Sequence, residues 1–148
     1  MVIEGQQQLD ELLYQALRAV YRLERAKVEA HGLDYGAIYL LQYLRRHSPA
    51  AVTMAAREMR VPVSTASRLA GRLEKRGLVR RCQDPRDRRR TLVHLEPDGE
   101  QVVREVERHS FEIISANLEK LRPDALNRLV EAARLLPEVL EADDEDVG

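Results

Sequence analysis

Arginines crowd one short stretch of this chain. Residues 80–95, RRCQDPRDRRRTLVHL, place six arginines within the first eleven positions. Between Arg57 and Arg90 the sequence has twelve basic and four acidic residues, a formal charge of +8, whereas the rest of the chain carries −9. Arginine runs also occur on ordinary solvent-exposed surfaces, so charge alone does not distinguish a binding site from such a surface. A guanidinium matches phosphate oxygens, however, and the local excess of charge points to a polyanion, most often nucleic acid.

The segment before the arginine run has the spacing of two helices joined by a tight turn. Thr53 is the expected N-cap of a short helix that ends near residue 59. Pro62 follows and breaks this helix. A second helix is predicted over residues 63–76 because Gly77 is a common stop signal.

The second helix has two distinct faces. Its core face is predicted from apolar residues at steps of three and four: Ala66, Leu69, Ala70 and Leu73. A different face carries Thr65, Arg68, Arg72 and Arg76, with Ser64 and Ser67 near the start of the helix. Short hydroxyl side chains let a helix approach closely, and arginines reach phosphates or the guanine edge. This pattern favours a recognition helix in a DNA major groove.

Two short β-prone runs follow the helices. LVRRC and TLVHL flank the polar segment QDPRDRRR, which predicts a hairpin with a long basic tip. A helix-turn-helix followed by a basic hairpin is a winged helix, and an arginine at the tip is expected in the minor groove. Asp84 and Asp87 are predicted to shape this tip by holding guanidinium groups in fixed positions.

These segments resemble the MarR family of bacterial transcription regulators. The family's wing reads D-x-x-D-R-R, followed by a strand and an L-T-x-x-G turn. The matching positions are Asp84, Asp87, Arg88, Arg89, Leu95, Glu96 and Gly99. Glu96 stands where the family usually has Thr, and Pro62 stands where a Ser or Thr cap is common. The resemblance covers the central third closely, and the flanking helices match by length and order.

The resemblance implies a mainly α fold with a small β-hairpin wing. In this reading residues 1–148 form a single MarR-like domain with its winged helix-turn-helix lobe at 35–97. Residues 5–30 and 98–142 would form a helical dimerisation region, and 143–148 an acidic tail. The family relationship also implies a homodimer, and a small molecule or oxidant that controls DNA release. We expect a mostly apolar effector pocket between the lobe and the helical region, with unknown contact residues.

Apolar stripes on the terminal helices agree with a dimer. Leucines and alanines recur at helical spacing over residues 5–30, and further apolar residues do so over 97–120 and from Pro123 onward. One small lobe cannot bury all of them. Partner helices are the simplest destination for these stripes.

Two functions from different classes fit the basic centre. The first is a sequence-specific regulator, released or retuned by a small ligand, that binds double-stranded DNA at an inverted repeat. Its recognition helix would use Ser64, Thr65, Ser67, Arg68 and Arg72, and its wing Arg86, Arg88, Arg89 and Arg90. The alternative is an architectural DNA-binding protein with little sequence preference. The serines and threonine favour the first, since a coating protein needs only Lys and Arg there.

Other residue types argue against further chemistry. No apolar run approaches the roughly 20 residues of a membrane span, so we expect a cytoplasmic protein. Cys82 is the single cysteine and is expected to be a half-buried strand residue, and the four histidines lack metal-ligand spacing. The five tyrosines could line an effector pocket but more often serve packing. No catalytic motif or phosphate loop is present, so no enzyme, cofactor or metal is expected.

Overall fold

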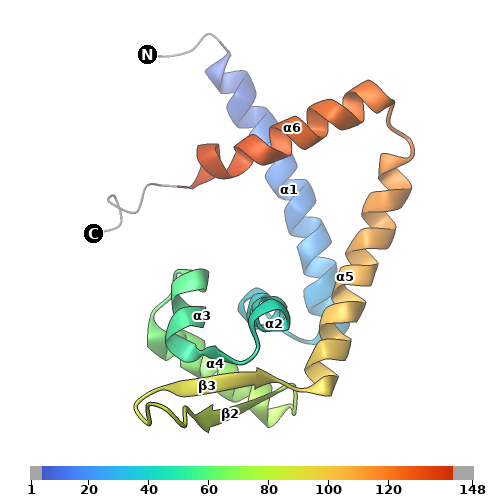
Figure 1. Ribbon diagram of the computed structural model, residues 1–148. Helices are drawn as coiled ribbons and strands as arrows, with labels where there is room; N and C mark the ends of the chain where they lie inside the picture. The colour runs from blue at the N-terminus through green and yellow to red at the C-terminus, as the bar shows by residue number, and fades with distance from the viewer. Residues whose placement is uncertain (1–4, 142–148) are drawn as a thin grey trace. The chain divides into compact units, whose positions relative to one another are not determined.

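The computed structural model describes residues 5–141, so the acidic tail predicted at 143–148 lies outside the described residues. This part of the chain divides into two compact units, residues 5–109 and 110–141, and the division falls inside one long helix. Helices dominate, as predicted, together with a small β-sheet (Figure 1). In chain order the elements are α1 (Gln6–His31), α2 (Tyr35–His47), β1 (Ala50–Ala51), α3 (Val52–Met59), α4 (Val63–Lys75), β2 (Val79–Gln83), β3 (Thr91–Leu95), α5 (Pro97–Leu118) and α6 (Pro123–Leu140).

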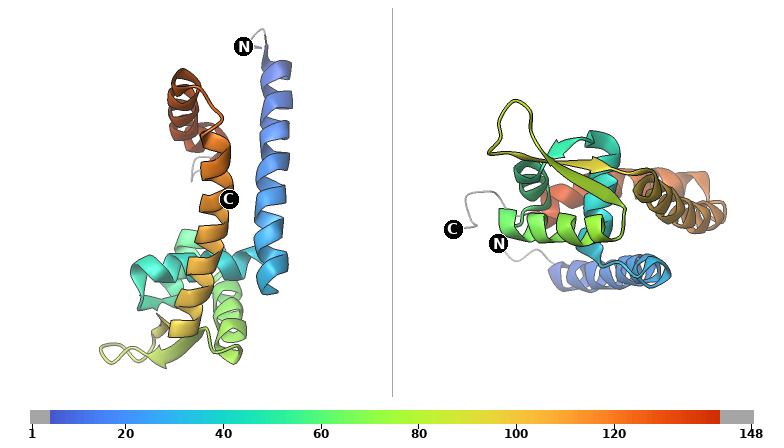
Figure 2. Two further views of the ribbon diagram at one scale, coloured as in Figure 1. Left: turned by 90° about the vertical axis from the view of Figure 1, so that its right-hand side faces the viewer. Right: turned by 90° about the horizontal axis from the view of Figure 1, so that it is seen from below.

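The predicted hairpin forms, and it belongs to a three-stranded antiparallel sheet. β2 pairs with β3 over its full length, from Val79 opposite Leu95 to Gln83 opposite Thr91. β1 pairs with the other edge of β3, so the strand order is β1-β3-β2. The loop between β2 and β3 projects beyond the helices of the lobe (Figure 2). The basic tip is therefore the part of the hairpin that extends from the lobe.

The predicted cap of α3 is wrong. Helix α3 begins at Val52, its N-cap is Ala51, and no side chain caps it, so Thr53 lies inside the first turn. The physical reason is β1, which fixes Ala51 in an extended conformation by pairing it with Leu92 and feeds the chain directly into the helix. The helix therefore starts one residue before the hydroxyl that could have capped it.

The end of α4 agrees with the predicted stop at Gly77. Gly77 has a φ of 73°, in the left-handed region, and its amide donates to the carbonyl of Glu74 at 2.9 Å. The next amide, of Leu78, donates to the carbonyl of Leu73 at 3.0 Å. This pair of bonds is a Schellman motif, which needs a residue that tolerates positive φ. It turns the chain from α4 straight into β2.

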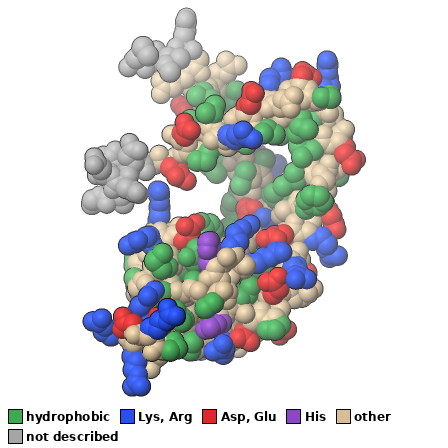
Figure 3. Space-filling model, in the orientation of Figure 1, with side chains coloured by type: hydrophobic (Ala, Val, Ile, Leu, Met, Phe, Trp, Pro, Cys, Tyr) green, Lys and Arg blue, Asp and Glu red, His purple; other side chains and the backbone are tan. Residues whose placement is uncertain are grey.

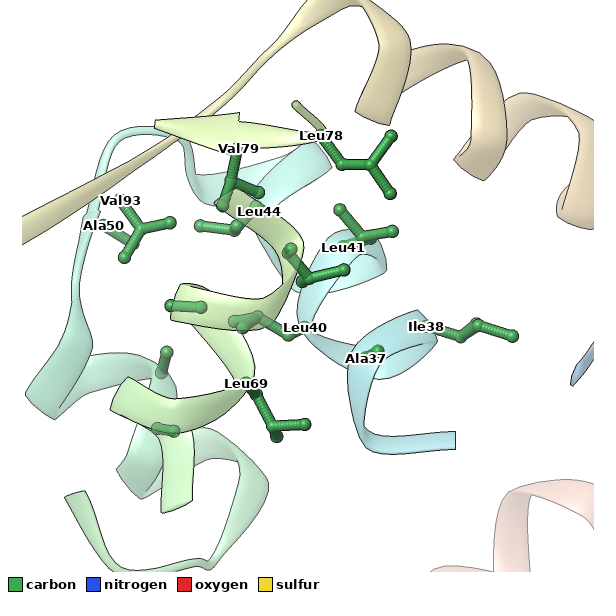
Figure 4. Packing of buried hydrophobic residues seen from close by; sticks show 14 of the residues in the cluster. Ala37, Ile38, Leu40, Leu41, Leu44, Ala50, Leu69, Leu78, Val79 and Val93 are labelled. Atoms are coloured by element: carbon green, nitrogen blue, oxygen red, sulfur yellow. The ribbon is translucent and has the colours of Figure 1, made fainter. Parts of the chain in front are cut away.

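One apolar core holds the lobe together and extends to the first part of α5. The face of α4 predicted to be buried is buried, and it packs with leucines of α2 and valines of the sheet (Figure 4). The largest fully buried side chains are Leu40, Leu41, Leu44, Leu73, Val79, Val93, Val103 and Val106. Core leucines and valines each contribute roughly 1.5–3 kcal/mol when fully buried. This packing fixes α4 and the hairpin against one another.

Gly99 joins the lobe to the start of α5 through a backbone contact. A Cβ at this position would lie 2.1 Å from the carbonyl oxygen of Leu78 and 2.8 Å from Cδ1 of Leu95. The same Leu78 carbonyl accepts a hydrogen bond from the Glu96 amide at 3.0 Å. Only glycine fits at this approach.

The apolar stripes of the terminal helices remain largely exposed in the single chain. α1 buries only Lys27 among its residues, and α6 buries none. Apolar residues that expose more than one third of their surface area include Leu9, Leu12, Leu17, Val20, Phe111, Ile114, Leu129, Val130, Leu136 and Leu140. None of the described helices is both long and apolar enough to cross a membrane.

Candidate nucleic-acid interface

The exposed face of α4 lies opposite its buried face. Ser64, Arg68, Gly71 and Lys75 follow one another at i, i+4, i+7 and i+11, which places them on one outward stripe. A shallow open groove runs along this stripe toward β2, and it is lined by Ser64, Ser67, Arg68, Gly71, Arg72, Glu74, Lys75 and Arg81. Four of the five predicted recognition-helix residues thus meet in the groove, while Thr65 is not part of its lining.

One flank of α4 is fastened to β2 by Arg81 and Glu74. The amide of Arg81 donates to Glu74 Oε2 at 2.7 Å, and its Nε donates to Oε1 at 3.1 Å. The Arg81 guanidinium also reaches the Ser67 carbonyl at 3.5 Å and passes over Gly71, where a Cβ would lie 3.4 Å from it. The hydrogen bond from the Arg81 amide, with the guanidinium, lowers the pKa of the Glu74 carboxyl against the opposing effect of burial.

The opposite flank of α4 is fastened to the junction between α1 and α2. Arg72 forms an ion pair with Asp34, the N-cap of α2, whose Oδ1 accepts from the Ala37 amide at 2.9 Å. One turn later, Arg76 donates to the carbonyls of Gly32 and His31 at 3.0 and 3.1 Å. Burial raises the pKa of the Asp34 carboxyl, but the hydrogen bonds from Arg72 and Ala37 outweigh it, so the pKa lies below its ordinary value.

Two aspartates organise the loop between β2 and β3. Asp84 is 8% exposed, and its Oδ1 accepts from the Arg86 amide at 2.9 Å while Oδ2 lies 3.8 Å from Nη1 of Arg90. Asp87 Oδ1 accepts from the amide and the Nε of Arg89, at 3.1 and 3.2 Å. The side-chain and backbone hydrogen bonds from Arg89 lower the pKa of the Asp87 carboxyl. Both acids therefore bind the residues of the loop that encloses them.

Four cationic side chains of α4 and the loop differ from their neighbours because they form no ion pair or hydrogen bond with other residues in the range 5–141. They are Arg68, Lys75, Arg86 and Arg88, and all four are exposed. Figure 3 shows Lys and Arg side chains gathered at the end of the lobe that carries the hairpin loop, with acidic side chains among them. The neighbouring arginines already contact acids or carbonyls: Arg72, Arg76, Arg81, Arg89 and Arg90. The four exposed cations therefore carry the charge that an anionic partner can neutralise.

Comparison with known proteins agrees with this geometry. Residues 31–90 match the MarR family. The transcriptional regulator MgrA of Staphylococcus aureus is 31% identical over 134 residues, which cover 90% of this chain and 88% of MgrA. The chain belongs to the MarR family. Its resemblance to that family, inferred above from the wing motif, is confirmed, and a MarR-family chain of this kind is a DNA-binding transcription regulator.

Solved structures share the MarR-family winged-helix fold. FabT of Streptococcus pneumoniae in complex with DNA is 17% identical, with a TM-score of 0.80 over 90% of this chain and 96% of FabT. BpsR of Bordetella bronchiseptica, solved to explain regulation of its DNA binding by 6-hydroxynicotinic acid, is 24% identical, with a TM-score of 0.73 over 97% of this chain and 99% of BpsR. At these identities the likeness establishes the fold.

Sequence reasoning missed three parts of this MarR-family surface. Lys75 and Gly71 were not singled out, although a helical wheel drawn from the buried Ala66, Leu69, Ala70 and Leu73 places them on the outward stripe. Asp34 pairs with a residue 38 positions later, so no local pattern signals it. Arg81 was counted as charge only, yet its alternation with the buried Val79 along β2 places both on the face that meets α4.

The remaining polar candidates form no second site among the described residues. Cys82 lies on β2 and is partly exposed, as expected, with its Sγ 3.3 Å from Nε2 of His94 on β3. No cluster of three or more His, Cys, Asp or Glu side chains that suits a metal ion occurs within residues 5–141.

Proposed function

We propose that this MarR-family protein acts as a homodimeric, sequence-specific repressor whose DNA affinity changes when a small molecule binds. The observation that carries the proposal is the outward stripe of α4 beside the basic loop. Ser64, Ser67 and Arg68 present short hydroxyls and a guanidinium of the kinds that read base edges in a major groove. Sequence-specific recognition accounts for the serines, which a DNA-coating protein does not need.

The proposed roles divide the contact residues into two groups. Arg68 reads a base edge with Ser64, Thr65 and Ser67 beside it, and Arg72 lies at the edge of the same groove. Arg88, at the loop tip, enters the minor groove, and Arg86 follows the DNA backbone. Arg89 and Arg90 lie beside them in the wing, paired with Asp87 and Asp84. Asp84 and Asp87 keep the loop in the shape that presents these arginines. The structure of FabT in complex with DNA, in the same fold, supports DNA binding as the activity of this fold.

The dimer and the effector rest on separate support. Exposed apolar side chains on α1, α5 and α6 need a covering surface, and a second copy of the chain offers the same stripes. Two recognition helices related by a twofold axis require an inverted-repeat operator with half-sites about 10 base pairs apart. The 6-hydroxynicotinic acid that regulates DNA binding by BpsR supports a small aromatic acid as the class of effector.

Selection of DNA fragments by the purified full-length protein tests the proposal. We expect an imperfect inverted repeat to emerge, bound at least about a thousandfold more tightly than random duplex in a competition titration. Sedimentation at micromolar concentration should give a dimer, and small aromatic acids should shift operator affinity. A monomer that binds a single half-site tightly contradicts the dimer. Equal affinity for selected and random DNA would instead identify an architectural DNA-binding protein.

A further inference from the structure

The contact between Arg72 and Asp34 joins the edge of the recognition helix to an element that does not itself line the groove. Arg72 is one of the groove's lining residues, and its side chain is 51% exposed. Asp34 caps α2 and is 49% exposed, and it is not among the residues of the groove. An exposed ion pair of this kind adds little to folding stability. The main effect of the pair is therefore on the charge of the groove.

The place of Asp34 is set by the backbone rather than by the ion pair. Its Oδ1 is held by the Ala37 amide, and the start of α2 packs tightly against α4 because a Cβ at Gly36 would lie 3.2 Å from Cδ1 of Leu69. Arg76 adds two hydrogen bonds to the end of α1 on the same flank. The carboxylate thus stands at a fixed position beside α4 whether or not Arg72 is present.

A fixed carboxylate at this position acts on DNA through Arg72. Among the recorded contacts of residues 5–141, the one partner of the Arg72 guanidinium is Asp34, so its charge is compensated. Binding to arbitrary DNA depends on how many phosphates are neutralised, and an arginine that pairs with a carboxylate must give up that contact before it can neutralise a phosphate. Binding to an operator also depends on base-edge contacts, which the stripe at Ser64 and Arg68 makes without Arg72.

We propose that Asp34 is a specificity-determining residue of this regulator, which lowers affinity for arbitrary DNA by keeping the guanidinium of Arg72 from neutralising a backbone phosphate. The inference rests on the proposed placement of α4 against DNA. Discrimination between two ligands improves when an unfavourable element acts against the wrong one. Asp34 is such an element, since its charge weakens every complex that relies on phosphate contacts alone.

Asp34→Asn tests this inference and leaves the helix cap in place, because the amide oxygen of Asn still accepts from Ala37. In the full-length protein we expect random-duplex affinity to rise at least about fivefold at 0.15 M salt, with a salt slope steeper by about one per subunit. Operator affinity should rise by a smaller factor, so the ratio of operator to random affinity falls. In the Arg72→Gln background the Asp34→Asn exchange should change none of these quantities.

Asp10→Asn is the matched control, because Asp10 is exposed and lies about 30 Å along α1 from His31, at 1.5 Å per residue. Equal behaviour of Asp34→Asn and Asp10→Asn overturns the inference, and so does an effect that persists without Arg72. A common loss of both affinities at unchanged slope also overturns it, since that is the mark of misfolding. If the wild type shows no sequence preference, the proposed function fails, and the slope on random DNA alone still decides whether Asp34 keeps Arg72 from neutralising a phosphate.

Discussion

Replacing the loop-tip arginine Arg88 by alanine separates the role of the wing from that of the recognition helix. Four cationic side chains per chain stand without a recorded partner on α4 and the loop, so a dimer presents eight. If each neutralises about one phosphate, the logarithm of affinity falls against the logarithm of salt with a slope near −7. Tripling the salt concentration then weakens binding by about three orders of magnitude.

Arg88→Ala should flatten this slope by about one per subunit and weaken operator and random DNA by similar factors, because a minor-groove arginine responds to groove width and phosphates. Arg68→Ala should instead cost about 1 to 3 kcal/mol at one base position of each half-site. Its effect on operator affinity should therefore exceed its effect on random DNA, and selection at that position should relax.

Fluorescence anisotropy titrations at several salt concentrations, with operator and random duplexes in parallel, measure both quantities. Arg104→Ala is the control, since it removes an arginine that pairs with Glu100 on α5, outside the groove and the loop. The reasoning is refuted if Arg88→Ala loses only operator binding or if Arg68→Ala loses both DNAs equally. A wild-type slope shallower than about −2 would mean that the basic centre is not the binding surface.

Three further outcomes follow from the packing. Gly99→Ala should destabilise the protein by about 1 to 3 kcal/mol in denaturant unfolding because its Cβ would meet the Leu78 carbonyl, whereas Gly71→Ala, with ordinary contacts only, should not. Glu74→Gln should flatten the acid dependence of stability: the folded-state pKa of Glu74 is lowered, so its contribution is present above about pH 4.3 and is lost as pH falls through the lowered value. Parallel stability curves for Glu74→Gln and the wild type between pH 6 and 3 would contradict this role. Val130→Asp, on the exposed stripe of α6, should shift sedimentation from dimer toward monomer, and an unchanged dimer would remove α6 from the proposed interface.

Local sequence signals predicted most of the helices and strands. They failed where contacts with residues distant in the sequence determine whether an element forms or where it begins. Gly77 stops α4 through its own positive φ, so composition alone locates that boundary within one residue. The two-residue strand at Ala50 has no β-prone residues, and it exists because Val93 pairs with it from the middle of the sheet. Its presence also moved the start of α3 away from Thr53.

In the candidate site, too, local patterns predicted the faces of the helix but not its long-range contacts. The buried face of α4 follows from helical period, and so does the outward stripe that includes Arg68. Which arginines are compensated does not follow from the period, because Asp34 and Arg72 are 38 residues apart and meet only once α2 has packed on α4. A count of charges therefore overstates the cations that are available to DNA, while the tertiary contacts identify them.

The contacts on both flanks of α4 have a consequence for changing the DNA preference of such a regulator by substitution. Because Glu74 and Arg76 contact neighbouring elements on either side of the helix, the outward residues take no part in holding it, and position 71 presents only a glycine. With the proposed placement of α4 on DNA, exchanges at 64, 68, 71 and 75 are expected to alter the preferred operator while the scaffold stays intact. Single surface substitutions would then change the target site without an intermediate variant of low stability. Such a helix is a practical starting point for building sensors with chosen operators.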